Sequence, residues 1–224
     1  MATRMKRRWL GQKGFTLMEI IVVLAVIGAL SAVLVPVVFR YIDDARRGQA
    51  HSDANVIAAA INQMYKDTGR WPFYRVGTSA LTPGASDAAF LTSNTGIDTS
   101  AAFPALSTDT LAPLAASGGV TGWTTTGKTD TLENQLIKNN PSYTITGGRA
   151  WKGPYVDKIP IVDPWGKAYL VNIGNANPAQ ETPGTQKWTI VISAGPNGVL
   201  DTNADTVATS SPAAGGDDIL ARVK

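Results

Sequence analysis

The sequence has 224 residues, of which 44% are hydrophobic and 17% are charged, and its formal net charge is +3. It contains no Cys and a single His, His51, which excludes disulfides, Cys-dependent zinc or haem sites and thiol nucleophiles. Five Lys and Arg residues lie within residues 1–14, and removing them leaves a net charge of −2 on the rest, so we expect no nucleic-acid-binding surface.

An uncharged, apolar run at residues 20–39 follows the basic segment. As a helix, this run would span about 30 Å, the thickness of a bilayer core. It is longer than the apolar region of a secretory signal, and Gly14, the small residue that could mark cleavage, precedes it. We therefore expect a retained membrane anchor, with residues 1–14 in the cytoplasm and the chain after about Arg40 across the membrane.

The carboxylate of Glu19 lies at the start of this run, where an unpaired charge is costly. One interpretation is an end residue whose side chain reaches the membrane interface. The other is an ion pair. Cleavage after Gly14 would free the amine of Phe15, four residues before Glu19, and the amine of one copy could meet the carboxylate of a neighbouring copy. The ion pair predicts an assembly of identical chains.

The segment KGFTLMEIIVVLAVIGALSAVLVP resembles the N-terminal signal of type IV pilins and of type II secretion pseudopilins. The resemblance implies that a prepilin peptidase cuts after Gly14 and methylates the new amine of Phe15. It also implies that Glu19 governs the docking of subunits and that Pro36 marks a bend or melted segment of the helix.

The helix is expected to continue beyond the membrane, from about residue 16 to residue 67. In its second half, apolar residues recur with helical spacing: Ala54, Ile57, Ala58, Ile61, Met64 and Tyr65. This half is therefore predicted to pack on local structure. We expect Gly69 to end the helix and Pro36 and Gly48 to be bend points.

The segment 77–130 has few charges and many Ser, Thr, Ala, Gly and Pro residues. A disordered linker would fit this composition, but spaced apolar residues favour an ordered, loop-rich insertion. After it, Thr129 or Asp130 is predicted to cap a short helix. Residues 168–173 and 188–193 are predicted strands, which would form a small antiparallel sheet that buries one face against the amphipathic helix.

Residues 193–220 are rich in oxygen ligands for a hard cation. The candidates are four carboxylates and one amide, from Asp201, Asp205, Asp217, Asp218 and Asn197. Ca²⁺ takes six to eight such oxygen ligands, and the neighbouring Gly residues allow a tight backbone. A solvated acidic loop would have the same composition. We expect one Ca²⁺ here.

Two blocks of the C-terminal half resemble type II secretion major pseudopilins. Residues 151–171 read WKGPYVDKIPIVDPWGKAYLV and resemble the block that separates those proteins from motility pilins, and residues 193–220 resemble their calcium loop. The resemblance assigns the acid pair of that loop to Asp217 and Asp218, and its main-chain ligands to the carbonyls near Val199 and Leu200.

This chain departs from the calcium-loop pattern in two ways. Asn197 stands where the family has an earlier acid, which removes one negative charge. The stretch 201–214 is longer than the family loop, so that either Asp201 or Asp205 replaces the missing charge or the insertion moves the site.

The expected fold class is α+β, with a long N-terminal helix packed on a small antiparallel sheet, a large loop-rich insertion and a C-terminal metal-binding loop. Five segments are expected. They are a cleaved leader (1–14), a transmembrane and filament-core helix (15–40), the amphipathic half of the helix with its exit (41–76), the insertion (77–130) and the sheet region with the calcium loop (131–224).

These patterns predict a structural subunit and not an enzyme. The expected protein is a type II secretion pseudopilin, which polymerises through its N-terminal helix to support protein export across the outer membrane. The alternative is a major subunit of a type IV surface pilus. Expected partners are identical copies, a prepilin peptidase, the inner-membrane assembly platform, minor pseudopilins and, before assembly, membrane lipid.

The expected location is the bacterial inner membrane. The chain would cross it once, with the N-terminus in the cytoplasm and the C-terminal domain in the periplasm, and would form a periplasmic filament after assembly.

Overall fold

The computed structural model describes residues 14–72, 90–93, 105–106, 129–160, 162–176, 187–203 and 214–223, without the side chains of residues 105, 106 and 129. The chain divides into two compact units, residues 1–45 and residues 46–224. Residues 1–13 of the predicted leader, most of the predicted insertion and the candidate ligand Asp205 lie outside the described residues.

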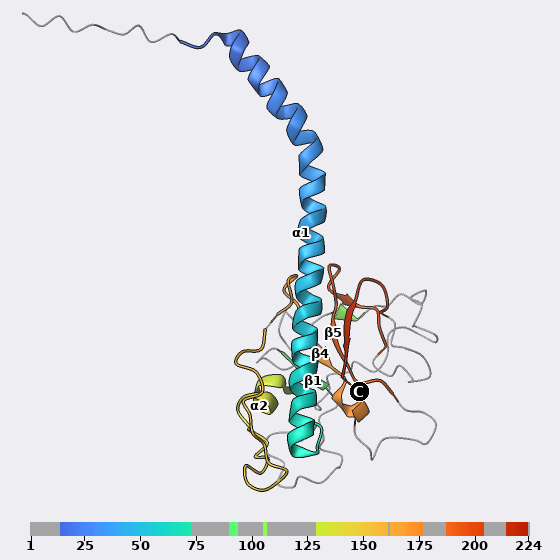
Figure 1. Ribbon diagram of the computed structural model, residues 1–224. Coiled ribbons are helices and arrows are strands. Elements are labelled where there is room, and N and C mark those ends of the chain that lie inside the picture. Colours follow the sequence, from blue (N-terminus) through green and yellow to red (C-terminus); the bar gives the residue numbers. More distant parts are fainter. Residues whose placement is uncertain are drawn as a thin grey trace, which may run out of the picture. The chain divides into compact units, whose positions relative to one another are not determined.

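Helix α1 spans Leu17–Thr68 (Figure 1). It contains both Pro36 and Gly48. Its length confirms the prediction of one continuous helix from about residue 16 to residue 67. At its N-terminus, the N–H of Glu19 donates a hydrogen bond to Oγ1 of Thr16 at 3.2 Å, so Thr16 caps the helix.

The C-terminus of α1 is closed by Gly69, as the sequence predicts. Its φ of 68° is the left-handed conformation that favours glycine. Its N–H donates to the carbonyl of Tyr65 at 2.7 Å, and Oγ1 of Thr68 donates to the carbonyl of Met64 at 2.8 Å. Two carbonyls of the last turn are therefore satisfied without water.

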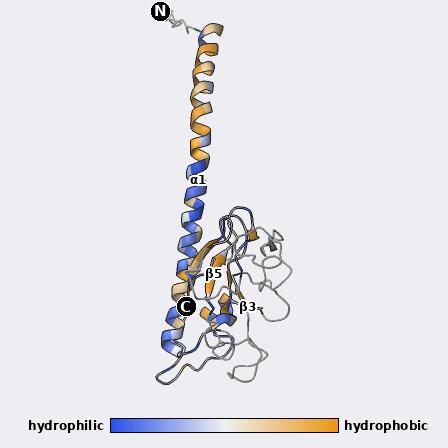
Figure 2. Cartoon of the chain, turned by 90° about the vertical axis from the view of Figure 1, so that its right-hand side faces the viewer, coloured by the Kyte–Doolittle hydropathy of each residue, from blue (hydrophilic) through white to orange (hydrophobic). Residues whose placement is uncertain are grey.

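The first unit exposes its apolar side chains. None of residues 14–45 is buried, and the large apolar side chains from Phe15 to Ile42 are all at least 40% exposed. Figure 2 shows the run of hydrophobic residues along this part of α1. By length and composition, α1 is able to cross a membrane.

The second unit buries one face of the remaining part of α1. The buried residues are Ala50, Ala54, Ile57, Ala58, Ala60, Ile61, Met64 and Thr68. They confirm the predicted amphipathic half, except at Tyr65, which is 40% exposed. The Tyr65 ring stacks on Trp71, with 4.1 Å between ring centroids, instead of facing the core.

Five strands form the main sheet of this unit, in the order β3-β1-β4-β5-β7. They are β1 (Phe90–Thr92), β3 (Thr129–Thr131), β4 (Leu170–Val171), β5 (Ile190–Ser193) and β7 (Ile219–Arg222). A second, two-stranded sheet pairs β2 (Ala105–Leu106) with β6 (Val199–Leu200). Short helices α2 (Leu132–Leu136) and η1 (Ile173–Ala176) complete the described elements.

The predicted antiparallel pair is present as β4 and β5, but the prediction of an antiparallel sheet is wrong. β1 pairs with β3 in parallel, which makes the main sheet mixed, and the two-stranded sheet of β2 and β6 is parallel. Among the described residues of the predicted insertion, β1 and β2 are strands and β3 begins at its end, and β1 lies inside the main sheet between β3 and β4. These strands have two or three residues each, which is too short to show the alternation of apolar and polar residues that identifies a strand in a sequence.

A buried tyrosine joins the helix to the sheet region. Tyr169, which is fully buried just before β4, donates from its hydroxyl to Oδ2 of Asp53 on α1 at 3.1 Å. Gln49 donates to the other oxygen of Asp53 at 2.7 Å. Burial, followed by the nearby Asp53 carboxylate, raises the pKa of Tyr169, so the phenol stays neutral and remains a donor.

We expect Ile61→Ala to lower the free energy of unfolding by about 2–5 kcal/mol, because Ile61 is fully buried in the core of the second unit. Val56→Ala shortens an apolar side chain of the same helix at a position that is 47% exposed. It should change the free energy of unfolding by no more than about 0.5 kcal/mol. Denaturant unfolding of the full chain in detergent would measure both, and equal effects would contradict the described packing.

Candidate functional site

The predicted processing and assembly residues Gly14, Phe15, Glu19 and Pro36 all lie in the first unit, and all four are exposed. Glu19 is the third residue of α1, three positions after the capping Thr16, which is the spacing of a capping box. It forms no ion pair with any described residue. In the uncleaved chain the nitrogen of Phe15 belongs to a peptide bond, so the geometry does not test the predicted pair.

The candidate metal ligands gather in the second unit, in what we call the carboxylate loop (residues 195–203 and 214–218). Asn197 lies at its centre. Its N–H donates to Oδ2 of Asp217 at 3.0 Å, and its Nδ2 donates to Oδ2 of Asp201 at 3.3 Å. Its Oδ1 accepts from the N–H of Val199 at 2.7 Å. The amide thus links two carboxylates that are 16 residues apart in the sequence.

Asp218 closes the loop from the other side. The side chain is 6% exposed, and its Oδ2 accepts from the N–H groups of Asp201 at 2.9 Å and Thr202 at 2.7 Å. The N–H of Gly215 donates to Oγ1 of Thr202 at 2.9 Å. The described residues before and after the gap at 204–213 are therefore hydrogen-bonded to each other.

Two glycines make this close approach possible. A Cβ on Gly215 would overlap the carbonyl of Asp201, and a Cβ on Gly216 would overlap the Asp201 carboxylate. Gly216 also has a φ of 53°, in the left-handed region. The backbone of 215–216 therefore lies directly against Asp201.

Two carboxylate oxygens in the loop lack partners. Oδ1 of Asp217 and Oδ1 of Asp218 are buried and accept no hydrogen bond from the described residues. A buried, unpaired acceptor costs about 1–3 kcal/mol, and more when the group is charged. Burial raises the pKa of Asp218 to about 6, although hydrogen bonds from Thr202 and from the backbone N–H groups of Asp201 and Thr202 oppose the shift.

This donor set fits a hard cation. Carboxylates, an amide oxygen and nearby carbonyls are Ca²⁺ ligands, and a cation would satisfy the two unpaired oxygens. Among the described residues, however, no three His, Cys, Asp or Glu side chains form a metal-binding cluster. An ion here would therefore have to take amide, carbonyl or water ligands as well.

The structure brings four of the seven predicted ligand residues together in one network. It does not test the other three as ligands. Asn197, Asp201, Asp217 and Asp218 form one hydrogen-bonded network with the backbone of the loop. The predicted main-chain ligands at Val199 and Leu200 form β6, which pairs with β2. Asp205 lies outside the described residues.

Sequence reasoning missed three residues that shape the loop. The hydroxyl of Thr202 accepts a hydrogen bond from the N–H of Gly215. The carboxylate of Asp163 accepts one from the hydroxyl of Ser193, which itself accepts from the N–H of Gly195 at 3.2 Å. The only signal for Asp163 was its place in Asp-Pro-Trp-Gly, a pattern typical of a turn built on an Asp side chain. Its bond to Ser193 joins residues 30 positions apart and has no local pattern.

Comparison with known proteins finds similarity to type IV pilin-like proteins. Residues 9–35 match the model of the prokaryotic N-terminal methylation motif. A fimbrial protein, EcpC, of Eikenella corrodens is 38% identical over 61 residues, and the type II secretion system core protein G of Pseudomonas aeruginosa is 40% identical over 70. The toxin coregulated pilin of Vibrio cholerae is 38% identical over 76 residues.

The matched regions are partial. They cover 27%, 31% and 33% of this chain, and 40%, 49% and 34% of these relatives. No solved structure matches the chain. The predicted resemblance to the type IV pilin-like family is confirmed, and the relatives include both pilins and secretion core proteins. All three are named as fimbrial, pilin or secretion-system proteins, and none as an enzyme.

The raised pKa of Asp218 predicts how the stability of the metal-free chain depends on pH. Below about pH 4 the group is protonated in both the folded and unfolded states. From 3.8, its ordinary pKa, to about 6, the folded state keeps a proton that the unfolded state has released, so stability falls as the pH rises. Asp218→Asn removes the titrating group.

Unfolding of the full chain in detergent and a chelator, measured at several values between pH 4 and pH 7, would test this. We expect a loss of about 2–3 kcal/mol in the native chain that is absent from Asp218→Asn, since each pKa unit corresponds to about 1.4 kcal/mol. The same pH slope in both proteins would show that Asp218 is not the group responsible.

Proposed function

We propose that this chain is the structural subunit of a type II secretion pseudopilus, which polymerises through α1 to support protein export across the outer membrane. The observation that carries the proposal is the methylation motif at residues 9–35, joined to a helix whose apolar side chains are exposed. Exposed apolar surface of this extent has to be covered by lipid or by other copies. Once processed, the chain would leave the membrane as its α1 packs against those of its neighbours.

The proposed anchoring follows from the same features. The chain would lie in the bacterial inner membrane with its basic N-terminus in the cytoplasm and its second unit in the periplasm. A prepilin peptidase would cut after Gly14 and methylate the amine of Phe15, and Glu19 of one copy would pair with that amine in its neighbour. Assembly would require an inner-membrane platform and minor pseudopilins.

A surface pilus is the second candidate, since relatives of this chain include a fimbrial protein and a pilin. The block at residues 151–171 and the carboxylate loop favour the pseudopilus, because both resemble secretion pseudopilins. Deletion of the gene separates the two. A pseudopilus subunit is required for export of secreted proteins, whereas a pilus subunit is required for long surface fibres and not for export.

We also propose that the carboxylate loop holds one Ca²⁺. The ligands would come from Asp217, Asp218 and Asn197, with Asp201 supplying the charge that Asn197 lacks and with carbonyls near residues 199–200. The unpaired buried oxygens of Asp217 and Asp218 support this assignment. When bound, the ion would neutralise acids that otherwise repel one another, in a chain that has no Cys for a disulfide.

Gly14→Ala should leave the leader attached. A Cβ on Gly14 would meet nothing within 4 Å, so the substitution should not disturb the fold, and the loss would reflect recognition by the peptidase. An immunoblot of cells that express the variant would show the longer form. Normal processing of Gly14→Ala would contradict the proposed cleavage site.

Glu19→Gln should abolish filaments while leaving membrane insertion and processing intact. Gln also serves at the third position of a capping box, so this variant keeps any capping role and removes only the charge. Glu19→Ala removes both. Electron microscopy of cells that overproduce the assembly machinery would count the filaments. If Glu19→Gln assembles normally and Glu19→Ala does not, Glu19 acts as a helix cap and not as an ion-pair partner.

Calcium should raise the melting temperature of the full chain in detergent. At a concentration 100 times Kd, binding would stabilise the folded state by about 2.7 kcal/mol, or roughly 5–10 °C. Asp217→Asn and Asp218→Asn should lose most of the shift. Asp157→Asn, an exposed acid of the same unit, should keep it. A melting temperature that is equal in calcium and in chelator would rule out the ion.

A further inference from the structure

Asp163 is a buried carboxylate that organises a turn of its own. The side chain is 3% exposed. Its Oδ1 accepts from the N–H groups of Trp165 at 3.0 Å and Lys167 at 2.8 Å, and the N–H of Gly166 donates to its carbonyl at 3.0 Å. These bonds wrap the Pro-Trp-Gly-Lys segment around one carboxylate oxygen, which leaves the other oxygen free to act elsewhere.

The second oxygen of Asp163 reaches β5. Oδ2 accepts from Oγ of Ser193 at 2.6 Å, and Ser193 is fully buried at the end of that strand. Because its proton is committed to Asp163, the Ser193 oxygen is oriented as an acceptor. It accepts from the N–H of Gly195 at 3.2 Å, and Gly195 begins the carboxylate loop.

The turn at 195–198 is held against the acid pair of the loop. A Cβ on Gly195 would overlap the carbonyl of Asp217, and the N–H of Asn197 donates to the Asp217 carboxylate at 3.0 Å. A Cβ on Gly198 would lie 2.9 Å from Cε of Lys167. One oxygen of Asp163 therefore reaches this turn through Ser193, and the other holds the backbone of Lys167, whose side chain lies beside Gly198.

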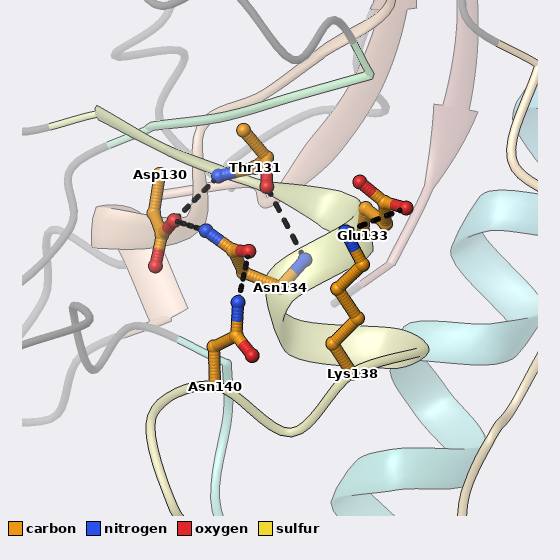
Figure 3. Close-up of polar contacts among 6 residues, drawn as sticks. All are labelled: Asp130, Thr131, Glu133, Asn134, Lys138 and Asn140. Carbon is orange, nitrogen blue, oxygen red and sulfur yellow. Dashed lines mark hydrogen bonds and ion pairs between the residues drawn. The ribbon is translucent and has the colours of Figure 1, made fainter.

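Asp130 is a matched carboxylate with a purely local role. It is 4% exposed and accepts three hydrogen bonds, from the N–H of Thr131 at 2.7 Å, Nδ2 of Asn134 at 2.6 Å and Nε2 of Gln135 at 2.8 Å. Figure 3 shows the first two of these bonds at the start of α2. All its partners lie within five residues, and Thr131 is the N-cap of α2, where the sequence had predicted Thr129 or Asp130.

We propose that Asp163 is the positioning residue of the carboxylate loop. Through Ser193 it fixes the 195–198 turn, so that Asn197 and Asp217 face the cation. The part of this inference that concerns the ion rests on the calcium proposal above, but the hydrogen-bonded chain from Asp163 to Gly195 stands without it. Second-layer residues of this kind typically contribute 10–100-fold to metal affinity by orienting the ligands.

Asp163→Asn and Ser193→Ala break this chain at different bonds. Asn keeps one oxygen for the N–H groups of Trp165 and Lys167 but presents an NH₂ group where Ser193 needs an acceptor. Ser193→Ala leaves Asp163 in place and removes the bond to Gly195. Asp130→Asn is the control, because it perturbs an equally buried carboxylate with the same number of bonds away from the loop.

The first measurement is amide hydrogen exchange of the full chain in detergent and chelator. Asp163→Asn and Ser193→Ala should each speed the exchange of the Gly195 and Asn197 amides about tenfold relative to Asp130→Asn. Two variants with different chemistry keep the test open if one of them fails to fold. Unchanged exchange at Gly195 in both would overturn the proposed chain of bonds.

The second measurement is calcium affinity by titration of the same proteins. Asp163→Asn should weaken binding about tenfold, Asp130→Asn should leave it unchanged, and the double variant Asp163→Asn/Ser193→Ala should bind no more weakly than either single one, because both act through one path. Equal affinity of the native chain and Asp163→Asn would overturn the inference alone. A native chain that binds no calcium would overturn the calcium proposal and, with it, the role of Asp163 in ion binding.

Discussion

The apolar side chains of the first unit must be covered by something outside the fold of a single chain. Residues such as Leu30 and Val33, which are 59% and 69% exposed, would each gain about 1.5–3 kcal/mol on burial. In the same helix, residues after 46 bury one face in the core of the second unit. The two parts of α1 therefore need different surroundings. The second part packs in the protein core, whereas the first part is stable only in lipid or against other copies. The membrane would meet that requirement before assembly, and the proposed filament would meet it afterwards.

The parts of the fold that were predictable from sequence are those with a long periodic signal. The limits of α1 and its buried face at Ile57, Ile61 and Met64 follow from helical spacing over many turns. The mixed sheet was not predictable, because β1 has three residues and pairs with β3 across a long stretch of chain. Parallel pairing of such distant, short segments leaves no local pattern.

The residues of the candidate site were also predictable in part, whereas their arrangement was not. Composition indicated the acids at 201, 217 and 218, because carboxylates and glycines cluster there. Their arrangement could not be predicted, since it depends on bonds such as Asp163–Ser193 and Asn197–Asp217, whose partners lie 30 and 20 residues apart. The unpaired oxygens of Asp217 and Asp218 are likewise a property of packing and not of sequence.

The central claim, that copies of this chain cover one another's apolar helices, can be tested by photo-crosslinking in living cells. A photoreactive residue at Leu30, within the exposed apolar segment, should form covalent adducts between two copies of the chain when the assembly machinery is present. The same photoreactive residue at Val56, in the second unit, is the control that measures nonspecific crosslinking. Adducts to lipid alone from Leu30, under conditions in which the chain is processed and the machinery is active, would contradict the account.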